Sequence, residues 1–433
     1  MDYSQLPSNN VICIDMKSFY ASCECVLMGL NPLTTMLAVV GDISRTGSVV
    51  LAASPLLKKQ YGIKTGSRLY EINNISDPNI YVVQARMGEY FKIAKRITEL
   101  FEEFVPPQAI HIYSVDESWL TLDGTEKLHG VPRVASLKLM DRILEETGIP
   151  SAVGIGDNKF LAKTALDNFA KKTGLAEVRY EQVKTMLHPL PIDKMWGVGS
   201  RLREHFHALG IRTYGDLACA PLEEIKKRFG KAGEQLYWYS WGVDLSPVFY
   251  DENSPPPSVF GFSFEENLTP VKSVGRGVTL LSDYIKSEDI LLVVRDLIDE
   301  VCEILREHKK VSKTIHLSIG YSKNSKQKGF SRQKSIKLHT NDVIEIYEIC
   351  SFLFHKFHVF GEPVRQINVS AGKLVNETER VILDEKMLKR RAIAKVTDDI
   401  NRKYGKGAIT KASALKQESI VQGRTKKIKG HYK

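Results

Sequence analysis

Three acidic residues lie where the sequence predicts the ends of buried strands. Asp15 directly follows a short, β-branched apolar run, and Asp116 and Glu117 lie between two further apolar runs. An acid at the end of a buried strand is costly unless it is hydrogen-bonded or holds a cation, and neighbouring acids repel one another. Carboxylate oxygens suit Mg²⁺, and two such ions can promote an in-line phosphoryl displacement. The three acids are therefore candidate metal ligands; the alternative is that they are strand-end caps or surface charges.

The order of the predicted elements brings these acids together. Strands are predicted at 11–14, 80–83, 110–114, 118–122 and 151–155, and helices at 88–104 and 134–146. With residues 22–79 set aside as an insertion, the chain from residue 11 follows the β-α-β-β-α-β order of a ferredoxin-like unit. Right-handed crossovers place the third strand of such a unit beside the first and antiparallel to it. The Asp116–Glu117 turn should then lie next to the strand end that carries Asp15.

The same element order is predicted again later in the chain. Strands are predicted at 259–264, 314–321, 330–338 and 366–369, and helices at 289–307 and 342–357. In the second of these strands Ile315, Leu317 and Ile319 alternate with polar residues, which predicts one buried and one open face. A glycine-punctuated helical stretch at 190–244 separates the two units, and a charged helical tail follows residue 376, with the stretch after Gln417 a candidate for disorder.

Composition and charge narrow the class of protein. The 433 residues are too many for one ordinary domain, no run approaches the ~18 apolar residues of a membrane span, and the polar start lacks a signal-peptide core. Six cysteines without a C-x-x-C pair predict reduced, mostly buried thiols. We therefore expect a cytoplasmic protein with no membrane partner.

Positive charge is concentrated in two blocks. Residues 386–433 contain 15 Lys or Arg and 3 Asp or Glu, and residues 309–337 contain nine Lys or Arg and no acid. Such blocks favour a polyanionic partner. The alternative is a solvated face or a tail kept soluble by its charge.

Two sequence motifs carry a family resemblance. The segment Asp15-Met16-Lys17-Ser18-Phe19-Tyr20, followed by Tyr113-Ser114-Val115-Asp116-Glu117-Ser118, resembles the two metal-binding motifs of Y-family DNA polymerases. The likeness extends over about residues 11–374 and is nearest to the UmuC/DinB group, particularly the UvrX-type branch of Gram-positive bacteria. Either motif alone is weak, but the pair is specific.

The resemblance implies an α+β, right-hand polymerase fold. Its expected parts are a ferredoxin-like palm (1–21 and 80–175), small fingers (22–79), a helix-hairpin-helix thumb (176–248), a linker (249–258), a βαββαβ little finger (259–375) and a basic C-terminal tail (376–433). These boundaries follow from combining the resemblance with the predicted elements.

The resemblance also implies an active site. Asp15, Asp116, Glu117 and the backbone carbonyl of Met16 would hold two Mg²⁺ ions. Phe19 and Tyr20 would contact the nucleotide, with Tyr20 as a steric gate against a ribose 2′-hydroxyl, although aromatic residues at such positions are more often simple packing. Lys58 and Lys171 would bind the incoming triphosphate, although isolated lysines are usually surface charges. Many relatives have Tyr and Arg where this chain has Pro55 and Lys58.

Two further regions are predicted to contact DNA. Trp196-Gly197-Val198-Gly199 has the form of a helix-hairpin-helix turn, in which Gly197 and Gly199 let the backbone approach a phosphate; the alternative is an ordinary tight turn. Basic residues in and after a hairpin of the second unit would neutralise phosphates: Lys323, Lys326, Lys328, Arg332, Lys334 and Lys337.

The sequence therefore predicts a template-directed, low-fidelity DNA polymerase that extends primers past damaged bases in DNA repair and the SOS response. Its expected partners are primed template DNA and deoxynucleoside triphosphates, and we expect a monomer. A sliding clamp or an accessory protein is a further candidate partner, although the segment Glu379–Asp384 lacks the Gln and the aromatic residue of a clamp-binding peptide. The alternatives are a catalytically idle DNA-binding recruitment protein and a nucleotidyl cyclase.

Overall fold

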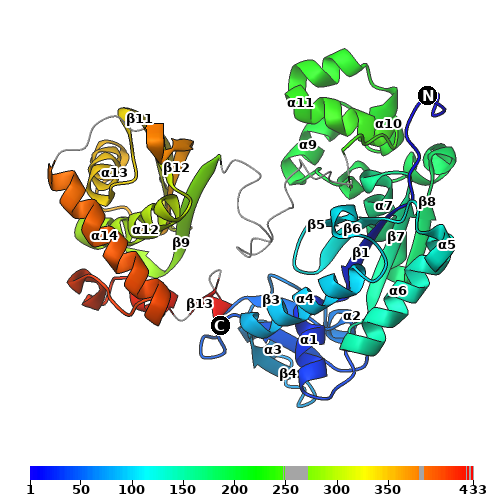
Figure 1. The fold of residues 1–433 in the computed structure, drawn as a ribbon, viewed down its shortest axis with the longest axis horizontal. Helices are drawn as coiled ribbons and strands as arrows, with labels where there is room; N and C mark the ends of the chain where they lie inside the picture. The colour runs from blue at the N-terminus through cyan, green and yellow to red at the C-terminus, as the bar shows by residue number, and fades with distance from the viewer. Residues whose placement is uncertain (247, 249–271, 380–384, 426, 429–430, 433) are drawn as a thin grey trace. The chain divides into compact units, whose positions relative to one another are not determined.

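The computed structural model describes residues 1–246, 248, 272–379, 385–425, 427–428 and 431–432. The chain divides into two compact units, residues 1–269 with 431–433 and residues 270–430. Each unit is built around a sheet of its own (Figure 1).

The first unit contains a five-stranded sheet in the order β5-β6-β1-β7-β8. Its strands are β1 (Val11–Met16), β5 (Ile110–Ile112), β6 (Glu117–Thr121), β7 (Ser151–Gly156) and β8 (Leu175–Val178). β1 pairs antiparallel with β6 on one side and with β7 on the other, while β8 pairs parallel with β7. The predicted position of the third strand beside the first is confirmed, and β8 is an additional strand that was not predicted.

Helices pack on this sheet in two groups. Their bounds are α4 (Met87–Phe101), α5 (Glu126–His129), α6 (Pro132–Thr147), α7 (Lys159–Ala165), the π-helical turn η2 (Leu166–Ala170) and α8 (Lys171–Thr173). Val11 and Cys13 of β1 form a buried cluster with Ala162 of α7 and Leu166 of η2. Because side chains alternate along a strand, Asp15 lies on this same side of β1, under α7 and η2.

A glycine on β7 lets α7 and η2 lie directly on the sheet. A Cβ atom added at Gly154 would lie 2.2 Å from both the Ala162 carbonyl oxygen and the Leu166 nitrogen. These are backbone atoms, so no side-chain rotation could relieve the clash. The close contact fixes the height of α7 and η2 above β1.

Exposed ion pairs link α4 to α6 on the outside of this unit. Arg96 lies 2.8 Å from Glu146, and Arg142 lies 3.0 Å from Glu103. Exposed pairs of this kind contribute little stability each.

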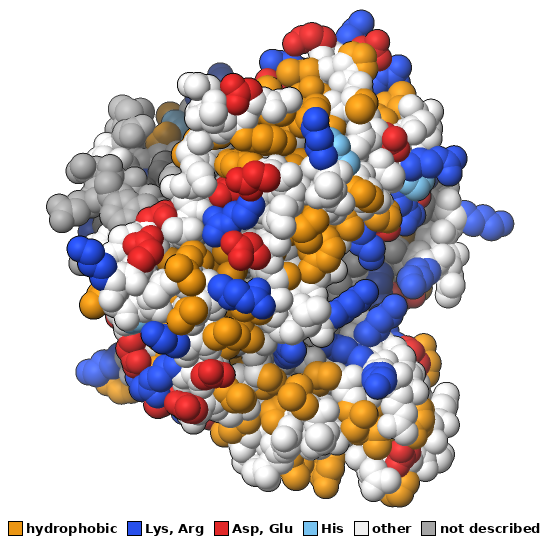
Figure 2. Space-filling view, turned by 90° about the vertical axis from the view of Figure 1, so that its right-hand side faces the viewer, with side chains coloured by type: hydrophobic (Ala, Val, Ile, Leu, Met, Phe, Trp, Pro, Cys, Tyr) orange, Lys and Arg blue, Asp and Glu red, His pale blue; other side chains and the backbone are white. Residues whose placement is uncertain are grey.

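Over much of the face drawn in Figure 2, Lys and Arg side chains lie beside Asp and Glu side chains. This agrees with the 46 basic and 48 acidic residues in positions 1–385.

A small three-stranded sheet, in the order β3-β2-β4, is inserted after β1. Its elements are β2 (Leu37–Val40), β3 (Val50–Ala53), β4 (Tyr81–Gln84), α1 (Phe19–Leu27), α2 (Pro55–Tyr61) and α3 (Leu69–Asn73). The strand predicted at 80–83 is therefore present, but it pairs parallel with β2 in this sheet and not in the larger one. The expected boundary at residue 22 falls within α1.

A helical region follows β8 in the first unit. Its elements are η3 (Tyr180–Gln182), η4 (Val183–Leu187), η5 (Ile192–Lys194), α9 (Ser200–Ala208), α10 (Tyr214–Cys219) and α11 (Leu222–Ser240). Phe206 and Tyr239 of this region share a core with Phe160 of α7. The predicted helical stretch is confirmed, and this shared core attaches it to the sheet.

The second unit contains a four-stranded antiparallel sheet in the order β11-β10-β12-β9. Its elements are β9 (Ser273–Tyr284), α12 (Ser287–Glu307), β10 (Lys310–Tyr321), β11 (Phe330–Thr340), α13 (Val343–Phe357) and β12 (Val364–Asn376). The β-α-β-β-α-β order is confirmed. The strand predicted at 259–264 and the linker at 249–258 lie outside the described residues, and β9 supplies the first strand.

The two faces of this sheet differ in composition. Ile315, Leu317 and Ile319 are buried against α12 and α13, as their alternation predicts. On the opposite face, stretches 273–279, 314–320, 331–335 and 366–372 present only Ser, Thr, Gly, Asn, Gln and His. The open face is therefore polar but uncharged along these stretches.

The segment after β12 packs onto this unit. Its elements are η6 (Glu377–Glu379), α14 (Glu385–Tyr404), η7 (Ala412–Leu415), α15 (Val421–Thr425) and β13 (Lys427–Ile428), whereas β14 (His431–Tyr432) belongs to the first unit. Asp296 of α12 accepts hydrogen bonds from the Ser419 hydroxyl (2.8 Å) and the Ile420 amide (3.0 Å), and Ile420 packs against the core of the unit. Residues 418–425 are thus ordered on α12, which contradicts the expectation of disorder after Gln417.

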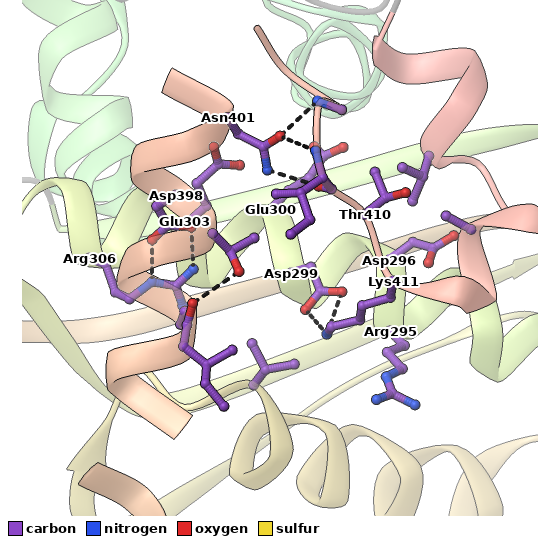
Figure 3. A pocket seen from close by; sticks show the side chains of 18 of the residues that line it. Arg295, Asp296, Asp299, Glu300, Glu303, Arg306, Asp398, Asn401, Thr410 and Lys411 are labelled. Carbon is purple, nitrogen blue, oxygen red and sulfur yellow. Dashed lines mark hydrogen bonds and ion pairs between the residues drawn. The ribbon is translucent and has the colours of Figure 1, made fainter. Parts of the chain in front are cut away.

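Ion pairs surround a cavity of about 340 Å³ between this segment and α12 (Figure 3). Arg306 pairs with Asp398 at 2.7 Å, and Lys411 pairs with Asp299 at 2.6 Å. Arg424 pairs with Glu300 at 2.7 Å. Lys411 and Arg424 of the C-terminal segment are therefore paired with acids of α12.

None of the helices in the described part of the chain combines the length and the apolar character needed to cross a membrane. One further short element, η1 (Pro107–Ala109), leads into β5.

Candidate active site

The three predicted acids lie together at one end of the first sheet. Asp15 of β1 is directly opposite Glu117 of β6 in the strand register. The Met16 amide donates to the Asp116 carbonyl oxygen at 2.9 Å, and the Ser114 hydroxyl donates to the Asp116 carboxylate at 2.6 Å. Strand pairing therefore fixes the backbone positions of all three acids.

A strained turn follows the strand that carries Asp15. Ser18 has a φ of 50°, in the left-handed region that costs a non-glycine residue roughly 1–2 kcal/mol. The Ser22 hydroxyl donates to the Lys17 carbonyl oxygen at 2.6 Å, and the Lys17 amide donates to the Pro150 carbonyl oxygen at 2.8 Å. These bonds hold the turn, so that α1 begins at Phe19 next to the acids.

Lysines from α7 and α8 neutralise two of the acids. Lys163 is almost fully buried, and its ammonium lies 2.7 Å from the Glu117 carboxylate. Lys171 lies 3.3 Å from Asp15 and 2.8 Å from Asp167. The site thus contains charges of both signs in close contact.

Electrostatics at Asp15 favour a bound cation. Burial raises the pKa of Asp15 to about 6, Lys171 opposes this rise, and repulsion from Asp116 and Glu117 adds to it. For Lys58, burial lowers the pKa, and the nearby Lys171 charge acts in the same direction against the attraction of Asp15. A further positive charge would therefore stabilise the ionised Asp15.

The donor set fits a hard divalent cation, although the side chains do not converge on one. Among the described residues, no three His, Cys, Asp or Glu side chains are grouped so that they could hold a metal ion. Glu117 is engaged by Lys163, and the Cys13 thiol donates to it at 3.4 Å. Asp15, with its raised pKa and acidic neighbours, is nevertheless the kind of carboxylate that a metal ion stabilises.

The two predicted aromatic contacts differ in burial. Phe19 is 2% exposed and packs inside the protein, so its ring is not open to a ligand. Tyr20 is half-buried and stacks on Tyr90 with 4.7 Å between ring centroids. The Tyr90 hydroxyl donates to Glu24 at 2.6 Å, and Arg86 also pairs with Glu24. Tyr20 is thus held against the ring of Tyr90, which is itself hydrogen-bonded to Glu24. Burial raises the pKa of Tyr20, and the negative charge of the nearby Asp116 raises it further.

Lys58 lies within the electrostatic reach of Asp15 and Lys171. Its ammonium donates to the Ser18 hydroxyl at 2.8 Å, and its electrostatic environment includes Asp15, Lys171 and Asp116. Both lysines predicted to bind a triphosphate are therefore brought to the acids.

The predicted hairpin turn in the helical region requires glycine at one position. Gly197 has a φ of 95°, which other residues rarely adopt, and Gly199 precedes the first turn of α9. A Cβ atom at Gly199 would meet nothing within 4 Å, so the backbone there is open to approach. Trp196 stacks on Tyr239 and anchors the turn to α11.

The six basic residues predicted to contact DNA in the second unit, which we call the basic stripe, divide into two groups. Arg332 is opposite Leu317 in the register and Lys334 is opposite Ile315, so both lie on the helix side of the sheet. Their charges lie 5.2 Å from the Phe357 ring and 4.1 Å from the Phe352 ring. Three lysines lie exposed in the hairpin loop and one on β11: Lys323, Lys326, Lys328 and Lys337. The stripe is therefore not a single surface.

The sequence analysis missed two residues of the site. Lys163 and Asp167 precede Lys171 by eight and four positions, a spacing that would place all three near one helix face. That spacing was the available signal. The candidate clamp segment lies outside the described residues beyond Glu379, and Arg390 and Arg391 pair with Asp342 and Glu377.

Comparison with known proteins identifies the same regions. The family model of the impB/mucB/samB family matches residues 14–167, and the model of its C-terminal domain matches residues 271–383. The model of the thumb domain of DNA polymerase iota matches residues 193–244. The three matches fall on the first unit's sheets, on the helical region and on the sheet of the second unit.

Relatives match along the whole chain. UvrX of Bacillus subtilis (strain 168), which its name associates with UV-damage repair, is 42% identical over 100% of this chain and 99% of its own length. DNA polymerase IV 2 of Halalkalibacterium halodurans is 33% identical over 98% of this chain and 99% of its own. A solved Y-family DNA polymerase chimera of Dbh and Dpo4 has a TM-score of 0.66 and 24% identity, covering 85% of this chain and 99% of that one. The chain therefore belongs to the impB/mucB/samB family, the Y family of DNA-directed DNA polymerases.

Proposed function

We propose that this polymerase extends a primer past damaged template bases by metal-assisted nucleotidyl transfer, with a role in DNA repair and the SOS response. The observation that carries the proposal is the register of Asp15 opposite Glu117 beside the lysines Lys58 and Lys171. A nucleotidyl-transfer site needs carboxylates that bind metal ions and cationic side chains that bind phosphates, and both are present here. The names of the relatives support a role in the repair of UV damage and DNA polymerase activity.

Divalent metal ions, most simply two Mg²⁺, would be held by Asp15, Asp116, Glu117 and the carbonyl of Met16. When bound, such ions activate the attacking hydroxyl and stabilise the charge on the leaving group. The residues themselves contribute a fixed set of carboxylates, because strand pairing between β1 and β6 holds their backbones. Asp15 has the environment that gains most from a cation.

The nucleotide would be bound by lysines and by one aromatic ring. Lys58 and Lys171 would contact the triphosphate through charge-assisted hydrogen bonds. Tyr20, stacked on Tyr90, would lie against the sugar and exclude a 2′-hydroxyl by contact. Phe19 supports this ring from within the protein rather than as a ligand.

DNA would be held by two regions outside the acids. The open backbone at Gly199 and the first turn of α9 suit a phosphate, and the loop lysines of the second unit suit another part of the duplex. The uncharged open face of the second sheet adds hydroxyl and amide donors for backbone contacts. We accordingly propose the first sheet as the palm, the inserted sheet as the fingers, the helical region as the thumb and the second unit as the little finger.

Primer extension tests the proposal. A 5′-labelled primer on a template is incubated with Mg²⁺ and dNTPs, using the unmodified protein and Asp116→Ala. We expect template-dependent extension by the unmodified protein and none by the variant, with DNA binding intact in both. DNA binding without extension by the unmodified protein, where a control polymerase works, would contradict the proposal and favour an idle DNA-binding protein.

A further inference from the structure

Five residues form a continuous series of alternating charges through the site. The series runs from Glu117 to Lys163 (2.7 Å), Asp167 (3.0 Å), Lys171 (2.8 Å) and Asp15 (3.3 Å). We call it the ion-pair ladder. Its two ends are the acids that face each other across β1 and β6.

The three inner members of the ladder come from one helical segment. Lys163, Asp167 and Lys171 are spaced four residues apart on α7, η2 and α8, which run without a break. η2 is a π-helical turn, an uncommon element that often occurs at functional sites. Gly154 lets this segment rest on the sheet, so its side chains reach the acids at a fixed height.

We propose that Lys163 and Asp167 are positioning residues for nucleotidyl transfer. Lys163 holds the Glu117 carboxylate in place, and Asp167 keeps Lys171 beside Asp15 until an incoming triphosphate engages that lysine. This inference rests on the proposed function, and it concerns residues to which the sequence analysis gave no role.

The geometry at Lys163 indicates a fixed partner. Lys163 and Glu117 are 7% and 8% exposed, so neither charge can be left alone without a large cost. Lys163 bonds a second carboxylate, Asp167, and is therefore held from two sides. The carboxylate of Glu117 cannot turn freely while this lysine is present.

The geometry at Lys171 indicates a partner that can be exchanged. Lys171 is 45% exposed, and its contact with Asp15 is longer than its contact with Asp167. A cation arriving at Asp15 would compete with the lysine for that carboxylate, whereas the shorter contact with Asp167 would remain. Lys171 would then stay at the site with its charge available to a phosphate.

Nucleotide binding tests the role of Asp167 directly. The affinity of a matched dNTP is measured by calorimetry on the full-length protein bound to a dideoxy-terminated primer–template with Mg²⁺, so that no reaction occurs. We expect Asp167→Asn to weaken binding by about tenfold, because one charge-assisted bond is lost. Glu89→Gln, which removes the exposed partner of Lys92 at 2.9 Å on α4, is the matched control and should bind normally.

Steady-state extension then separates positioning from general damage. We expect Asp167→Asn to raise KM for dNTP by about tenfold with kcat changed less than about threefold. We expect Lys163→Met to lower kcat by about 100-fold with dNTP affinity nearly unchanged, and Lys163→Arg to recover most of the rate.

The outcomes distinguish this inference from the proposed function. No extension by the unmodified protein contradicts the proposed function itself. Extension by the unmodified protein together with normal dNTP affinity in a folded Asp167→Asn overturns the inference alone. If Lys163→Met does not fold, Asp167→Asn and Lys163→Arg decide, because Asp167 is partly exposed and arginine keeps the charge.

Discussion

In the first sheet the first strand of the unit, β1, lies between two other strands, whereas in the second sheet the first strand, β9, is at an edge. Both units have the order β-α-β-β-α-β, but the central position of β1 encloses its end between β6, β7 and the α7–η2 segment. The acids there are desolvated and paired with lysines. Along the described stretches 273–279, 314–320, 331–335 and 366–372, the second sheet keeps an uncharged face on the side away from α12 and α13.

The order of strands in the sheet, more than the order of elements along the chain, therefore decides which polar or charged surface a unit exposes. An enclosed strand end concentrates charge and raises the pKa of Asp15. An open face of small polar residues offers hydrogen bonds without a strong field. Four sets of variants test this difference between the two units.

The largest effect is expected from exchanging a carboxylate in each unit. Asp15→Asn should reduce the extension rate by at least about 1,000-fold, because a neutral amide cannot hold a metal ion as a carboxylate does. Asp342→Asn in the second unit removes a carboxylate that caps α13 and pairs with Arg390. It should lower the melting temperature and leave the rate within about threefold. Equal losses of rate in the two variants would remove the contrast.

Glycine substitutions test how closely each sheet is covered. Gly154→Ala should destabilise the first unit by about 3 kcal/mol or more, because its Cβ would overlap backbone atoms of α7 and η2. Gly372→Ala on the open face of the second sheet meets nothing within 4 Å and should change stability by less than about 1 kcal/mol. Urea unfolding followed by circular dichroism measures both. A small effect at Gly154 would mean that α7 and η2 can move away from the sheet.

Acid should affect the two sheets unequally through their histidines. Burial lowers the pKa of His111 on β5 to about 4, from an ordinary value of 6.5, with help from Lys159. The unfolded chain therefore binds more protons between pH 6.5 and 4, and stability is lost as the pH falls through this range. After allowance for the partial exposure of His111, the free energy of unfolding should fall by up to about 2 kcal/mol over this range.

His111→Phe should remove much of that acid sensitivity. His316 on the open face has a pKa lowered by burial, and His316→Asn should alter the pH profile less, since the pKa of His316 is lowered less than that of His111. Thermal unfolding between pH 7 and 4 checks this. A profile that His111→Phe leaves unaltered would show that other groups control acid stability.

The smallest effect is expected from dividing the basic residues of the second unit. A triple Gln variant of Lys323, Lys326 and Lys328 should weaken DNA binding by about tenfold and reduce the slope of log affinity against log salt by about two to three. Lys334→Gln removes a charge that lies over Phe352 and should leave the salt slope almost unchanged. Fluorescence anisotropy at several salt concentrations measures both. If Lys334→Gln reduced the salt slope more than the triple variant does, Lys334 would be a DNA contact.

Alternation and strand-end chemistry were sufficient to predict much of the molecule. The apolar run before Asp15 and the turn at Asp116 and Glu117 placed the acids together, because a ferredoxin-like order leaves few alternatives. Alternation in β10 also predicted its buried residues. These features depend on local pattern, which a single sequence contains.

Other features depend on contacts that a local pattern does not contain. Phe19 and Tyr20 are adjacent aromatics, and only the path of α1 decides that the first is buried. Arg332 and Lys334 lie at every second position between Phe330 and Ile336, which pack against the core, so the period of a strand predicts that all four share one side of β11. The Lys163–Glu117 pair joins residues 46 positions apart. The partners that the C-terminal segment has on α12 lie more than 90 positions away.

The docking of the C-terminal segment changes the meaning of a common deletion experiment. Truncation after β12 would be designed to remove positive charge, but it would also uncover Asp296, Asp299 and Glu300 on α12, which now have partners in that segment. The shortened protein would carry a new acidic surface on its second unit. Weaker DNA binding by such a truncation would then report repulsion created on α12 as well as attraction lost with the tail, and neutralising these three acids in the truncated protein would separate the two.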